Sequence, residues 1–117
     1  MADKNAIVAL NVGSQRVSLS RFSRAKGGGL ILQDYAFSEL SGDPAADSAR
    51  LPQVGVAITE LVGRLGVSKA DVRYAISGHS VFTRFVKLPP LDEEKVDELV
   101  QFEAQQNVPF PINAVAW

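Results

Sequence analysis

Hydrophobic and polar positions divide the first forty residues into three stretches with the pattern of β-strands. Ala6–Leu10 is a continuous apolar run, as in a strand buried on both faces. Val17–Phe22 alternates apolar and polar side chains, and Leu30–Glu39 has the composition of a third strand. Because short glycine-bearing connections separate these stretches, we predict an antiparallel three-stranded meander.

A change of period predicts a helix after Ser41–Arg50, a small and polar stretch typical of a surface loop. The apolar side chains of this helix recur on one face: Val54, Ala57, Ile58, Leu61, Val62 and Leu65. Pro52 suits the first helical turn, and Gly66 suits the position just past the end. Gly55 and Gly63 weaken the helix, so we expect close packing on their side.

The sequence after this helix predicts a fourth strand and then a second, smaller substructure. Val72–Ile76 has the composition of a strand, and a strand–helix–strand crossover predicts a parallel arrangement. Val81–Leu88 alternates apolar and polar positions, which predicts another strand, and a pair of prolines ends it. Asp92 is a good N-cap for an acidic second helix, and residues 114–117 have the pattern of a strand cut short.

Composition and charge limit the classes of protein to consider. The 117 residues include no Cys, which excludes disulfides, thiolate zinc sites and a cysteine nucleophile. Twelve Lys and Arg against thirteen Asp and Glu give a net charge of -1, so we expect no nucleic-acid partner. No apolar run approaches the roughly 18 residues that a membrane-spanning helix needs. We therefore expect a cytoplasmic α/β domain.

The turn after the first strand is the first candidate for chemistry. Asn11, Gly13 and Ser14 follow the apolar run, and we expect a positive φ at Gly13. A glycine turn can direct backbone N–H groups at a phosphate, with the Ser14 hydroxyl as a further donor. An ordinary hairpin turn explains the same residues better, and neither standard glycine-rich phosphate motif is present.

Two further residues, His79 and Glu103, are candidates for a chemical role. His79, the only histidine, lies beside Ser80, but no third group orients the pair, so we expect a plain loop histidine. Glu103 falls on the apolar stripe of the second helix, where a carboxylate should be either paired or exposed. Arg84 is its candidate partner; the alternative is that the stripe turns toward solvent at Glu103. We expect no catalytic and no metal-ligating residue.

Two segments flank the acidic helix, AISGHSVFTRFVKLP over 75–89 and FEAQQNVPFP over 102–111. Together they closely resemble the PilM family of type IV pilus assembly proteins, and VALNVGS over 8–14 is similar to the family's first strand and phosphate turn. The resemblance implies a truncated actin-like (ribonuclease H-like) α/β fold. It places subdomain 1A at 1–78 and a small inserted strand–helix–strand subdomain 1C at 79–117.

The resemblance implies nucleotide chemistry only for a longer protein. The family's first strand usually ends Asp-x-Gly-Ser, in which the Asp helps to place Mg²⁺ beside ATP, but here Asn11 stands at that position. Gly13, Ser14 and Gln15 would then hold phosphate. We expect ATP and Mg²⁺ in the full-length protein at most, and no cofactor on this chain alone.

The resemblance also implies a partner and a location. PilM-like proteins lie at the inner face of the cytoplasmic membrane and bind the N-terminal tail of the membrane protein PilN. Phe82, Arg84, Val86 and Phe110 are the candidate contacts, although core packing explains each of them too. Other pilus assembly proteins are expected partners, and strand exchange between copies could cover an open sheet edge.

Three functions remain open from the sequence. The first is a non-catalytic assembly scaffold that docks a PilN-like tail. The second is an ATP-dependent switch or ATPase of the same fold, in which Asn11 is tolerated. The third is an FtsA-like cell-division protein, against which the Val-Pro-Phe-Pro segment at 108–111 argues.

Overall fold

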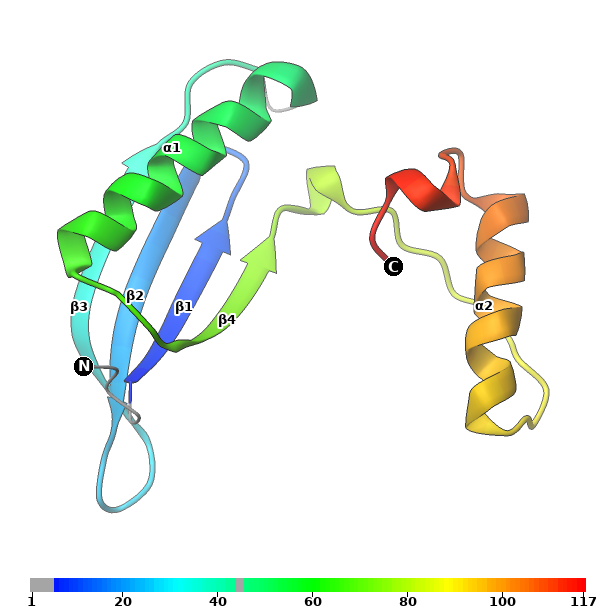
Figure 1. Cartoon of the computed structure of the whole chain (residues 1–117), viewed down its shortest axis with the longest axis horizontal. Coiled ribbons are helices and arrows are strands. Elements are labelled where there is room, and N and C mark those ends of the chain that lie inside the picture. Colours follow the sequence, from blue (N-terminus) through cyan, green and yellow to red (C-terminus); the bar gives the residue numbers. More distant parts are fainter. Residues whose placement is uncertain (1–5, 44–45) are drawn as a thin grey trace. The chain divides into compact units, whose positions relative to one another are not determined.

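A computed structural model describes residues 6–43 and 46–117 (Figure 1). Along the chain the elements are β1 (Ala6–Val12), β2 (Arg16–Arg24), β3 (Leu30–Glu39), α1 (Asp47–Leu65), β4 (Asp71–Ile76), η1 (Gly78–Ser80), α2 (Glu93–Asn107) and η2 (Ile112–Ala114). The contacts divide the chain into two compact units, Met1–Val81 and Phe82–Trp117. Their assignment to subdomains 1A and 1C, with a boundary at 78/79, stays a prediction.

The first unit contains a four-stranded mixed sheet in the order β3-β2-β1-β4. β1 pairs antiparallel with β2, and β2 with β3, which confirms the predicted meander. β4 runs parallel to its neighbour, as the crossover predicted, and that neighbour is β1, so that Leu10 lies beside both Leu19 and Tyr74. β4 forms one edge of the sheet, and all of its residues are exposed.

The core lies between α1 and one face of the sheet (Figure 1). Its buried apolar side chains among the described residues, each at most 6% exposed, are Val8, Val17, Leu19, Ala36, Ala57 and Leu61. The rest of the predicted α1 stripe packs around them: Val54, Ile58, Val62 and Leu65. The helical spacing therefore identified the buried face of α1 correctly, because a 3.6-residue period places these side chains on one side.

The C-terminal end of α1 agrees with the sequence prediction, whereas its N-terminal end does not. Gly66 has φ 61° and forms the expected left-handed C-cap, with its N–H donated to the Gly63 carbonyl. α1 begins at Asp47, so that Pro52 lies inside the helix rather than at its start. The expected close packing at Gly55 and Gly63 is wrong, because no heavy atom lies within 4 Å of a Cβ built at either position.

The second unit contains α2 and η2, and two predicted strands are wrong there. Residues 82–90 form no strand, and the predicted strand at 114–117 is replaced by the end of η2 and irregular chain. A strand needs a neighbour for its N–H and C=O groups, and none of the described residues in this unit supplies one. Asp92 is the N-cap residue of α2, but its side chain makes no capping hydrogen bond.

Candidate functional site

The hairpin turn between β1 and β2 contains Gly13, and a side chain larger than that of glycine would not fit at this position. The Gly13 N–H donates to the Arg16 carbonyl at 2.8 Å. A Cβ at Gly13 would lie 2.9 Å from that same oxygen, closer than real Cβ contacts allow. The expected positive φ is wrong, because Gly13 is absent from the described glycines with positive φ. Glycine is required here because two backbone segments approach each other closely.

Arg50 of α1 holds this turn from the protein interior. Its side chain is buried, with 8% of the residue exposed. The guanidinium donates to the Ser14 carbonyl at 2.6 Å and also to the Gly13 carbonyl. The next carbonyl, that of Gln15, accepts from the Leu40 N–H at 2.7 Å. Three consecutive carbonyls of the turn are therefore bonded to α1 or to the end of β3.

This arrangement determines where the amides of the turn point. In a trans peptide the C=O and the following N–H point in opposite directions, and the described chain has no cis bond. Since Gly13 and Ser14 direct their carbonyls at Arg50, the N–H groups of Ser14 and Gln15 point away from it. No acceptor in residues 6–43 and 46–117 takes either N–H. Two adjacent free N–H groups are the kind of backbone donor pair that binds anions.

The structure brings the predicted phosphate residues together but gives them unequal roles. Gly13 uses its own N–H within the hairpin, so that this donor is not available to an anion. Ser14 is half-buried and Gln15 is exposed, and both keep a free N–H as described above. Asn11 is exposed on β1, beside Ser18 of β2. Asn11 offers only a neutral amide oxygen, which is a weaker ligand for Mg²⁺ than a carboxylate.

Arg50 was not among the predicted site residues, because the sequence pattern placed it at the end of a surface loop. Residues 44 and 45 of that predicted loop lie outside the described residues, and α1 already begins at Asp47. The signal was present in the spacing, because Arg50 precedes Val54, Ala57 and Leu61 by 4, 7 and 11 residues. Arg50 thus continues the buried stripe of α1 by one more turn.

Arg16, the residue after the turn, has an exposed side chain that contacts residues of β3. Its Nη2 lies 2.6 Å from Oε1 of Glu39, and its guanidinium lies over the Phe37 ring at 4.1 Å from the centroid. The hydrogen bond to Glu39 raises the pKa of Arg16 above its ordinary value, so that Arg16 stays charged. Because Glu39 pairs with this charge, Arg50 is the cation most closely associated with the turn itself.

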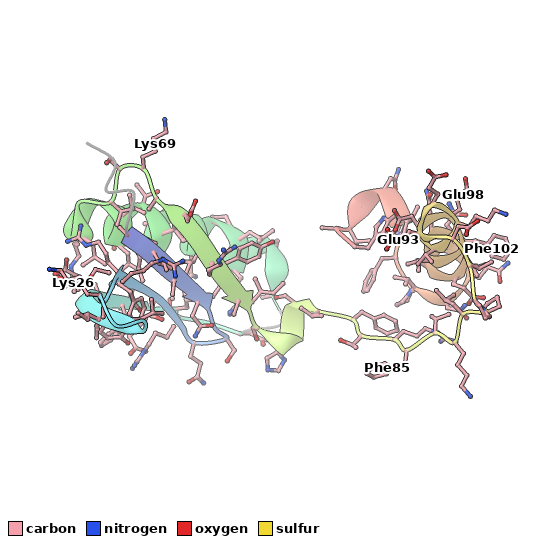
Figure 2. All side chains as sticks on the ribbon, turned by 90° about the horizontal axis from the view of Figure 1, so that it is seen from below. Lys26, Lys69, Phe85, Glu93, Glu98 and Phe102 are labelled. Atoms are coloured by element: carbon pink, nitrogen blue, oxygen red, sulfur yellow. The ribbon has the colours of Figure 1, made fainter. Side chains whose placement is uncertain are left out.

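The four predicted partner contacts all lie on the surface of the second unit. Phe82, Arg84 and Val86 come from irregular chain between η1 and α2, and Phe110 follows α2. Phe82 is 52% exposed, Val86 39% and Phe110 53%. Between them along the chain, Phe85 is 95% exposed, and its ring stands clear of the backbone trace in Figure 2. The structure therefore leaves these apolar groups accessible, and their role stays a prediction.

His79 and Glu103 have local roles only. His79 is exposed in η1, where its N–H donates to Ser77 Oγ at 3.3 Å. Glu103 accepts from Asn107 Nδ2 at 2.9 Å, one helical turn on, and no ion pair with Arg84 is present among the described residues. The predicted Arg84–Glu103 pair is therefore wrong. Within the described ranges, no group of three acidic or histidine side chains could hold a metal ion.

Comparison with known families supports the resemblance. The family model described as type IV pilus assembly protein PilM matches residues 9–117, a span that includes the turn, α1 and α2. The chain belongs to the PilM family. Among the described residues of this PilM-family chain, no helix is long and apolar enough to cross a bilayer.

Solved structures give weaker likenesses. The diol dehydratase-reactivating factor in its nucleotide-free form is 15% identical, with 62% of this chain and 12% of that chain covered and a TM-score of 0.40. A Ppx/GppA family member from Aquifex aeolicus is 12% identical, with 90% and 33% covered and a TM-score of 0.38. The PilM-family chain thus spans at most about a third of these proteins, and such low TM-scores carry no argument about its function.

Proposed function

We propose that this PilM-family chain acts in type IV pilus assembly as a docking module. Its partner would be the cytoplasmic N-terminal tail of a PilN-like inner-membrane protein, so that the chain works at the inner face of that membrane. One observation carries the proposal: none of the described residues from Phe82 to Trp117 is buried, although several are large and apolar. Exposed apolar side chains grouped in one short unit favour an interaction surface over an isolated domain.

The segment 82–88 has the chemistry to bind an extended peptide. Its backbone groups take part in no described ladder, so they can pair with a peptide strand by β-augmentation. Phe82, Arg84 and Val86 share one face of such a strand, because side chains alternate with a period of two. Phe82 and Val86 would hold apolar side chains of the tail, and Arg84 would meet an acidic one. The strand pattern in the sequence is then satisfied only when the partner is present.

An amide-shift titration of the chain with the tail peptide of its cognate PilN-like protein tests this function. Saturable shifts over 82–88 and near Phe110 are expected. Phe110→Ser should weaken binding by about tenfold or more, as for an interface anchor. Phe102→Ser is the matched control, since Phe102 is also 53% exposed but lies on α2. Equal loss in both variants, or no shifts at high peptide excess, would contradict the docking role.

The free amides of Ser14 and Gln15 favour a second function, a switch that responds to a nucleotide in the longer protein. These donors fit a phosphoryl oxygen, whereas Asn11 fits Mg²⁺ poorly. ATP with Mg²⁺ would supply a triphosphate whose charge the turn could sense. Asn11→Asp should raise the affinity of the full-length protein for Mg·ATP, measured by calorimetry. An unchanged affinity would mean that no metal-linked nucleotide site exists at this turn.

A further inference from the structure

Arg50 lies in the first turn of α1, and its side chain bonds main-chain carbonyls outside its own helix. A buried guanidinium is costly unless its donors are satisfied, and here two of them bond main-chain carbonyls of a turn 36 and 37 residues earlier. α1 also bonds the chain just after β3, where Gln53 Oε1 accepts from the Ser41 N–H at 3.2 Å and the neighbouring Leu40 N–H donates to the Gln15 carbonyl of the turn. Hydrogen bonds therefore join the turn, the chain after β3 and the first part of α1.

The Leu40 N–H orients the peptide after Gln15, but among the described residues little besides Arg50 orients the two peptides before it. The hairpin itself contributes one closing bond outside the strand ladder, from the Gly13 N–H to the Arg16 carbonyl. Ser14 and Gln15 carry no positive φ, so that the turn is not locked by a left-handed residue. A planar guanidinium can hold two carbonyls with fixed geometry, which a single ammonium cannot reproduce. Arg50 is thus the group that orients the peptides preceding Ser14 and Gln15.

We propose that Arg50 is a positioning residue for a phosphoryl-binding site: it holds the β1–β2 turn so that the N–H groups of Ser14 and Gln15 face an anion. This inference rests on the second function proposed above. Arg50 does not touch the anion in this arrangement, because its donors lie on the carbonyl side of the two peptides. Its positive charge beneath the turn adds a favourable field for an anion on the other side.

Titration of the chain with inorganic phosphate, followed by amide shifts, tests the proposal with three variants. The wild-type chain should show saturable shifts at Ser14 and Gln15. Arg50→Met should bind phosphate about tenfold more weakly. Arg50→Lys keeps the charge but not the planar fork, so it should behave like Arg50→Met. Arg64→Met, at an exposed position in the last turn of α1, should behave like the wild type.

The outcomes separate the two parts of the proposal. No phosphate shifts in the wild-type chain would overturn the anion site, and with it the nucleotide function. Wild-type phosphate affinity in Arg50→Met would overturn positioning by Arg50 while leaving the anion site in place. Full affinity in Arg50→Lys would show that charge alone matters, which also overturns positioning. Urea unfolding of each variant shows whether it is folded, and Arg50→Lys decides the question if Arg50→Met is not.

Discussion

Substitution of Gly13 by alanine measures the steric constraint at the turn directly. The new Cβ would lie 2.9 Å from the Arg16 carbonyl oxygen, a backbone atom that already accepts from the Gly13 N–H at 2.8 Å. The two strands must therefore separate locally, at a cost of about 1–3 kcal/mol, as for other overpacked sites. Reduced freedom of the unfolded chain returns about 0.4–1 kcal/mol. We expect Gly13→Ala to lower the free energy of unfolding by about 1–2 kcal/mol.

Urea unfolding followed by circular dichroism is the assay, and Gly55→Ala is the matched control. Gly55 lies inside α1 with no heavy atom within 4 Å of a Cβ built there. Alanine at that position should stabilise the chain by about 0.5–1 kcal/mol, because it is the better helix former. The two identical chemical changes should thus shift the midpoint in opposite directions. If Gly13→Ala is as stable as the wild type, the close approach at the turn does not constrain the fold.

Three further substitutions test the packing of the two units. Leu61→Ala should cost about 2–5 kcal/mol in urea unfolding, because Leu61 is fully buried between α1 and the sheet; a smaller loss would contradict that core. Glu103→Gln should change the free energy of unfolding by less than about 0.5 kcal/mol, because among the described residues the Glu103 side chain bonds only to Asn107, one turn further along the same helix. A larger loss would indicate that Glu103 forms an ion pair. Phe85→Ser should leave the free energy of unfolding within about 0.5 kcal/mol of the wild type, because the side chain is 95% exposed; destabilisation would show that Phe85 is packed.

Sequence patterns predicted the elements of the first unit because their signals are local. The apolar run of β1, the alternation in β2 and the helical stripe of α1 each follow from the repeat of side-chain direction along one element. The parallel direction of β4 followed from its crossover connection through α1, although the sequence did not predict β1 as its neighbour. The C-cap at Gly66 followed from the freedom of glycine to adopt a left-handed conformation.

The same patterns failed where a residue depends on a distant partner. Val81–Leu88 alternates like a strand, yet no described neighbour supplies the other half of a ladder, and the segment stays irregular. The pairing of Glu103 with Arg84 failed because Asn107 lies closer along the same helix. The reason for Gly13 was also misassigned, since the approach of Arg16 is a property of the closed hairpin rather than of either residue.

The sequence by itself determined the class of fold, the order of the elements in the first unit and membership of the PilM family, because periodicity and motifs are properties of the local sequence. Only the tertiary structure showed that the Arg50 side chain bonds the carbonyls of Gly13 and Ser14. That contact joins residues 36 and 37 positions apart. Its formation depends on how α1 packs on the sheet, and no local preference of either segment encodes it.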